Sequence, residues 1–146
     1  MKPIPFDSLC LSVVLGELQP WVGAKVQRIS QPTPNEIVIE LHQGGIGWLL
    51  ISADPSYTRA HFVTKKPTNP VPVPGLCAAL RSHLEGGYIA SVAQPNGDRV
   101  LELEIQAGAF KFRLVAELIG RHANLILLDT SDRVVTALKT MGPSRS

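Results

Sequence analysis

The stretch VLELEIQAGAFKFRL, residues 100–114, decides the fold of this chain. Its first half alternates apolar with acidic residues, its second half alternates apolar with basic residues, and Ala107-Gly108 lies between them. Period-two alternation of this kind is typical of a β-strand with one buried face. The two halves therefore predict a β-hairpin that turns near the glycine.

The charges of the hairpin predict its register. With Glu104 opposite Lys111 and Glu102 opposite Arg113, each acidic side chain meets a basic one on the outer face. A shift of one residue would lose these matches and turn the apolar side chains outward. The apolar residues expected to meet on the inner face are Ile105, Leu103 and Leu101 on one strand and Phe110, Phe112 and Leu114 on the other.

Polar residues that flank the hairpin form the candidate functional site. Continued backwards, the predicted register sets Asp98 opposite Glu117, and further charged side chains follow the second strand directly. Since strand ends in one register meet at the same edge, these residues are expected at one rim of a sheet. By pattern alone, a salt-bridge cluster that closes the sheet edge is favoured over a binding site. The predicted rim residues are Asp98, Arg99, Glu117, Arg121, His122 and Asn124.

Two helices precede two blocks of strands. Asp7 or Ser8 is expected to cap a first helix that runs to about Gln19. A second helix is expected to begin at Pro74 and to end at Gly86. The residues expected on the apolar sides are Leu9, Leu11, Val13, Leu15 and Leu18 in the first helix and Leu76, Leu80 and Leu84 in the second.

The remaining apolar runs predict short strands. They are expected at residues 25–30, 37–41, 47–52, 88–93, 100–105, 110–117, 124–129 and 134–138. Residues 54–74 are rich in proline and predict a long ordered loop. Two blocks of meandering strands, each preceded by a helix, predict an α+β fold, mainly an antiparallel β-sandwich with two helices. The length of 146 residues favours a single domain, 1–146.

Composition limits the classes of function. The net charge is only +2, so any contact with nucleic acid must come from a local patch. The chain has no apolar run of signal-peptide or membrane-spanning length, so a cytoplasmic protein without a membrane span is expected. Cys10 and Cys77 fall in helical patterns and are expected to be free thiols. Neither zinc-type spacing nor a phosphate-binding glycine loop occurs, so no metal or cofactor is predicted.

A second basic stretch lies beside the proline-rich loop. By pattern alone it indicates a solvated face rather than a binding site. Under the resemblance given next, contact with a nucleic-acid backbone becomes an equal alternative. Its members are Arg59, His61, Lys65 and Lys66.

An ordered set of motifs resembles the N-terminal domain of the NFACT proteins, which include factors of ribosome quality control and proteins long described as fibronectin-binding protein A. The match extends to about Lys139, which indicates a piece of a longer multidomain protein. The matching motifs, in chain order, are Phe6-Asp7, Leu18-Gln19-Pro20, Gln31-Pro32, Ser52-Ala53-Asp54-Pro55-Ser56-Tyr57, Lys66-Pro67-Thr68-Asn69-Pro70, Leu80-Arg81-Ser82-His83-Leu84-Glu85-Gly86-Gly87, Gln94-Pro95, Asp98-Arg99 and Glu117 to Asn124.

The resemblance implies a domain that binds tRNA and, with the rest of the protein, the large ribosomal subunit. Such a factor recruits aminoacyl-tRNA to stalled subunits for template-free C-terminal tailing of the nascent chain. It further implies that Asp98-Arg99 takes part in tRNA binding. Two alternatives stay open, which are a surface adhesin for fibronectin or fibrinogen and a scaffold domain without binding activity of its own.

The resemblance also implies a fold similar to the N-terminal domain of formamidopyrimidine-DNA glycosylases, which attack with an N-terminal proline amine. Here Pro3 follows Lys2, which should hinder removal of the initiator methionine, and a proline nitrogen within a chain is an amide. No Ser/His/Asp or Cys/His nucleophile set is evident either. The domain is therefore expected not to be an enzyme.

Overall fold

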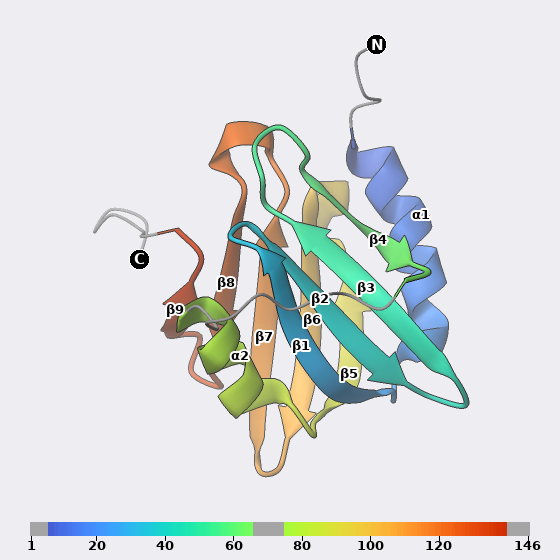
Figure 1. Cartoon of the computed structure of the whole chain (residues 1–146), viewed down its shortest axis with the longest axis vertical. Coiled ribbons are helices and arrows are strands. Elements are labelled where there is room, and N and C mark those ends of the chain that lie inside the picture. The colour runs from blue at the N-terminus through green and yellow to red at the C-terminus, as the bar shows by residue number, and fades with distance from the viewer. Residues whose placement is uncertain (1–5, 66–74, 140–146) are drawn as a thin grey trace.

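The computed structural model describes residues 6–65 and 75–139, and their strands form one antiparallel nine-stranded sheet with the order β4-β3-β2-β1-β5-β6-β7-β8-β9 (Figure 1). The strands are β1 (Lys25–Thr33), β2 (Glu36–His42), β3 (Ile46–Ser52), β4 (Arg59–Val63), β5 (Tyr88–Ala93), β6 (Val100–Ala107), β7 (Phe110–Glu117), β8 (Asn124–Leu128) and β9 (Val134–Ala137). The helices are α1 (Ser8–Leu18) and α2 (Gly75–Leu84), with short 3₁₀ turns η1 (Gln19–Trp21), η2 (Pro95–Gly97) and η3 (Gly120–His122).

The sheet folds over into two layers. Strands β1 to β4 lie in front of β6 to β8 in Figure 1, and the halves join at a short contact where Lys25 pairs with Tyr88. Buried side chains of both halves and both helices form one hydrophobic cluster. The predicted α+β, mainly antiparallel fold with two helices is therefore confirmed, and the two layers belong to one continuous sheet. The expected similarity to the glycosylase domain stays a prediction.

Helix α1 buries a different face from the predicted one. Leu11, Val14 and Leu18 are buried, whereas Leu9 and Val13 are 71% and 62% exposed. Positions two residues away from Leu11 lie about 200° around the helix axis, so one sheet surface cannot cover both sets. The expectation that Leu9 and Val13 share the buried side is wrong.

The hairpin of β6 and β7 has the predicted faces but a register shifted by two residues. Glu104 is paired with Arg113, not with Lys111. The expected charge pairs survive as diagonal neighbours, because Lys111 Nζ lies 3.3 Å from Glu104 and Arg113 lies 3.7 Å from Glu102. Gly108, at φ +62°, begins a two-residue turn, which draws the strands into this register.

Strand β4 lies inside the segment predicted as a loop. It pairs with β3 from Ser52↔Arg59 to Trp48↔Val63 and forms one edge of the sheet. Only Ala60 among its five residues is buried. A short edge strand that buries one alanine carries little hydrophobic periodicity, so the proline-rich composition around it dominated the prediction.

Candidate functional site

The ends of β6 and β7 meet at the predicted rim, with a corrected pairing. Val100, not Asp98, lies opposite Glu117, and the backbone N–H of Leu118 donates to the carbonyl of Arg99 at 2.8 Å. Asp98 therefore precedes the strand and lies in the loop after η2. The two-residue register shift explains this difference as well.

Gln94 holds the loop that carries Asp98 and Arg99. Its amide nitrogen donates to the carbonyl oxygens of Asp98 and Ser8, each at 2.9 Å, and its amide oxygen accepts from the Ser12 hydroxyl at 2.9 Å. One side chain thus ties this loop to the first turn of α1. Gln94 was not among the predicted site residues, although the Gln94-Pro95 motif was an available signal.

Asp7 caps α1 at the same helix end that Gln94 contacts. Its carboxylate accepts from the backbone N–H of Cys10 at 2.9 Å, and this hydrogen bond holds the pKa of Asp7 below its ordinary value. The predicted helix cap is therefore confirmed. With the cap in place, the α1 start is a firm support for the loop that Gln94 binds.

Asn124 lies opposite Glu117 across β7 and β8, as a rim position would require, but its side chain is only 5% exposed. Its amide oxygen accepts from the backbone N–H groups of Leu125 and Lys139, both at 2.9 Å, and its nitrogen donates to the Lys139 carbonyl at 3.2 Å. Asn124 therefore fastens the chain after β9 and does not point its amide outward.

Four rim side chains have no partner among the residues that the structure describes. Within residues 6–65 and 75–139, the side chains of Asp98, Arg99, Arg121 and His122 make no hydrogen bond or ion pair with one another or with other residues. All but the half-buried Arg99 are exposed. The salt-bridge cluster that the sequence also allowed is therefore not formed by these four residues.

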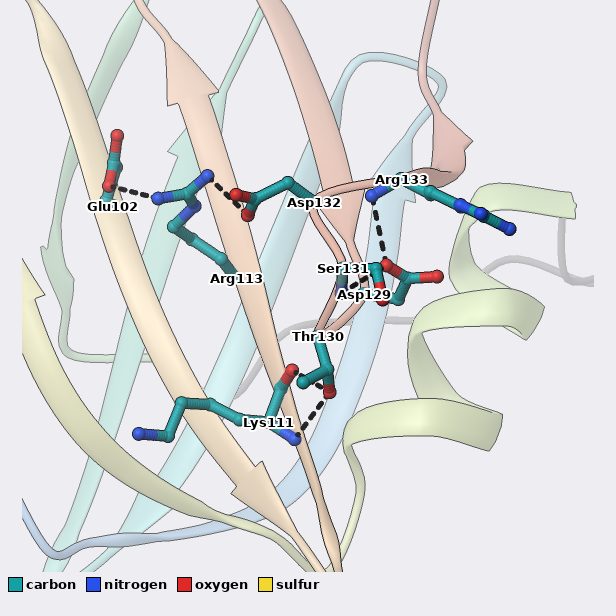
Figure 2. A network of polar contacts seen from close by, with 8 residues as sticks. All are labelled: Glu102, Lys111, Arg113, Asp129, Thr130, Ser131, Asp132 and Arg133. Atoms are coloured by element: carbon teal, nitrogen blue, oxygen red, sulfur yellow. Dashed lines mark hydrogen bonds and ion pairs between the residues drawn. The ribbon is translucent and has the colours of Figure 1, made fainter.

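The charged residues of the β6–β7 hairpin provide a contrast (Figure 2). Arg113 lies between two carboxylates, 3.7 Å from Glu102 and 2.8 Å from Asp132. The Thr130 hydroxyl donates to the backbone carbonyl of Lys111 at 3.0 Å and accepts from the backbone N–H of Lys111 at 3.3 Å. The Lys111 ammonium lies 3.3 Å from Glu104. Lys111 and Arg113 are thus paired with carboxylates, whereas Arg99 and Arg121 of the rim form no ion pair within the described residues.

The second basic stretch is partly joined to the rim. The Thr58 hydroxyl lies 3.5 Å from the carbonyl oxygen of Gly120, and Figure 1 shows the β3–β4 loop beside the β7–β8 connection. The Arg59 guanidinium stacks over the Tyr57 ring at 3.9 Å. His61 and Lys65 lie further along, in β4 and beyond its end, and Lys66 lies outside the described residues.

The rim lies apart from the groove between α2 and the β6–β7 hairpin. A groove of about 790 Å³ between α2 and the β6–β7 hairpin contains none of the predicted site residues. In the described part of the chain, no three His, Cys, Asp or Glu side chains gather as metal ligands, and no helix is long and apolar enough to cross a membrane. Cations that form no ion pair within the described residues suit an anionic partner.

Several curated proteins are similar to this chain in sequence. The chain is 35% identical over 130 residues to the Rqc2 homolog RqcH of Bacillus subtilis, covering 84% of this chain and 23% of that protein. It is 30% identical over 149 residues to the Rqc2 homolog RqcH of Streptococcus suis, covering 97% and 27%. The chain thus spans about a quarter of the length of these curated relatives.

A solved structure agrees with these relatives. The N-terminal part of the fibronectin/fibrinogen-binding protein from Streptococcus suis superposes with a TM-score of 0.90 at 29% identity, covering 94% of this chain and 55% of that one. The family model described as NFACT N-terminal and middle domains matches residues 7–146. This chain therefore belongs to the NFACT family, as the ordered motifs of its sequence predicted.

Proposed function

We propose that this domain binds tRNA in a ribosome-associated quality control factor, which recruits aminoacyl-tRNA to stalled large ribosomal subunits for template-free C-terminal tailing. Relatives named as Rqc2 homologs support the setting. Bond formation would belong to the ribosome, so the domain itself acts as a binding module and not as an enzyme.

The observation that carries the proposal is the set of unpaired rim cations. Arg99 and Arg121 present forked donors that match phosphate oxygens, and neither forms an ion pair within the described residues. His122 adds a ring that stacks or donates a hydrogen bond, and Asp98 accepts from the amino group of a base. Gln94 and the Leu118–Arg99 backbone hydrogen bond hold this geometry before the ligand arrives.

Salt dependence measures the number of phosphate contacts. Each neutralised phosphate contributes a slope of about −0.9 to the dependence of log affinity on log salt concentration. With Arg99 and Arg121 each on one phosphate, raising salt fourfold should weaken binding about tenfold. A chain with a net charge of only +2 has little other attraction for RNA, so these contacts should dominate the slope.

The test is the anisotropy of labelled tRNA titrated with the protein across a salt series. The double variant Asp98→Ala/Arg99→Ala and the single variant Arg121→Ala should lose affinity, and each should flatten the salt slope by about one contact. Arg133→Ala is the matched control, because this exposed cation lies in the β8–β9 turn. If the rim variants bind as tightly as the control, the rim is not the tRNA site.

Binding to an extracellular-matrix protein is the second candidate, because the solved structure from Streptococcus suis bears a fibronectin/fibrinogen-binding name. Immobilised fibronectin and fibrinogen, probed with the same variants, distinguish the two functions. Saturable binding to these proteins, with no binding to tRNA at low salt, would favour the adhesin. Binding to neither ligand would leave the domain as a scaffold.

A further inference from the structure

An exposed aromatic ring lies next to the rim. Tyr57 is 40% exposed, and the Arg59 guanidinium covers one face of its ring at 3.9 Å from the ring centre. The cation holds the ring in place by cation–π attraction and leaves ring surface open to solvent. A fixed and partly exposed aromatic ring is the element on which nucleic-acid-binding proteins stack bases.

The loop that carries Tyr57 is held by its own hydrogen bonds. The Asp54 carboxylate accepts from the backbone N–H of Ser56 at 2.9 Å and from its hydroxyl at 2.8 Å. The carbonyl of Asp54 accepts from the N–H of Tyr57 and from the Thr58 hydroxyl, both at 2.9 Å. The Ser56 N–H is the main reason that the pKa of Asp54 lies below its ordinary value. The ring is thus preorganised, which lowers the entropy lost on binding.

Arg59 carries a charge that the described protein does not neutralise. It forms no ion pair with residues 6–65 or 75–139, and its Nε is buried without a hydrogen-bond partner. The stack therefore presents a partly exposed aromatic ring beside a positive charge that no carboxylate of the described residues pairs with.

The loop that carries Tyr57 lies next to the turn that carries Arg121 and His122. Thr58 follows Tyr57 directly, and its hydroxyl lies 3.5 Å from the carbonyl oxygen of Gly120. Arg121 and His122 come next in the same 3₁₀ turn. A nucleotide strand whose phosphates lie on this turn would bring a neighbouring base to the Tyr57 ring.

We propose that Tyr57, backed by Arg59, is a stacking site for an unpaired base of the bound RNA, an assignment that rests on the proposed tRNA binding. Arg121 and His122 hold the adjoining backbone. The ligand at this position is a single-stranded nucleotide, in a loop or at an end, because bases within a duplex have both faces covered by their neighbours. Every base offers a π face, so the site selects single strands rather than a sequence.

The experiment compares a labelled single-stranded RNA with a blunt duplex RNA of the same length, each titrated over a salt series. Tyr57→Ala should weaken binding of the single strand about tenfold and leave duplex binding and the salt slope unchanged. Tyr57→Phe should bind like the wild type, because the ring is kept. Tyr88→Ala is the matched control, since Tyr88 is 53% exposed on β5.

A second variant separates stacking from loop support. Tyr57→Leu keeps apolar bulk at the position, so equal loss of single-strand affinity in the Leu and Ala variants, with unchanged thermal unfolding, supports stacking. Unchanged single-strand affinity in Tyr57→Ala, or equal loss for both RNAs, would overturn the stacking site. If Arg121→Ala still weakens binding in that case, the proposed function stands without it. No RNA binding by the wild type would overturn both.

Discussion

Arg81 in α2 and Glu85, directly after the end of α2, complete the hydrogen bonding of β1 where β1 separates from β5. The backbone N–H of Ile29 donates to the Glu85 carboxylate at 2.8 Å, and the Ile29 carbonyl accepts from Arg81 Nε at 2.7 Å. Ile29 is fully buried, so no water replaces these partners readily. Glu85→Ala should therefore destabilise the fold, although Glu85 is an exposed residue directly after the end of α2.

The magnitude follows from the group left unpaired. A buried N–H without an acceptor costs about 1–3 kcal/mol. The Arg81–Glu85 ion pair, at 3.9 Å and with both side chains partly exposed, adds less than about 1 kcal/mol. Glu85→Ala should thus lower the free energy of unfolding by about 2 kcal/mol. Glu85→Gln keeps an acceptor oxygen and should lose less than about 1 kcal/mol.

Urea unfolding followed by tryptophan fluorescence provides the measurement, with equal m-values required for comparison. A double-mutant cycle with Arg81→Ala tests whether the two side chains act together. Two results would refute the reasoning. The first is a Glu85→Ala protein within about 0.5 kcal/mol of wild type, the usual range for surface substitutions. The second is an equal loss in the Gln and Ala variants.

Two further predictions concern neighbouring parts of the fold. Gly87→Ala would place a Cβ 2.7 Å from a main-chain oxygen and should lower the free energy of unfolding by about 1–3 kcal/mol. Gly86→Ala should cost less, because its φ of +90° is strained but its surroundings are open. Thermal unfolding of both variants checks this order, and the reverse order would contradict it. Burial raises the pKa of the Cys77 thiol, so a thiol reagent at neutral pH should modify the partly exposed Cys10 first and reach Cys77 only on unfolding. Mass spectrometry of the native protein shows which thiol reacts, and equal labelling of both would contradict the burial argument.

The sequence by itself determined the elements whose signal is short-range. Alternation over residues 100–114 predicted the β6–β7 hairpin and its two faces, because side chains along a strand alternate whatever the partner strand does. Asp7 predicted the start of α1 for a similar reason, since a cap depends on groups three residues away. The same local signals placed Arg99 and Arg121 at neighbouring strand ends.

The tertiary structure decided those features for which the local sequence pattern allows more than one arrangement. The observed register of the hairpin differs from the predicted one by two residues. Glu104 meets a basic side chain as a diagonal neighbour as well as it would as a directly opposite one, so the charges alone do not fix the register. The turn at Gly108 selects the pairing. The buried face of α1 depended on which apolar stripe met the sheet, and Leu9 was left outside. Whether a polar side chain forms hydrogen bonds within the protein or stays available to a ligand depended on its neighbours in space. Asn124 found partners inside, and Tyr57 was brought to the rim by a contact between loops about sixty residues apart. Such long-range contacts leave no periodicity in the sequence, because they arise only when the whole sheet has folded.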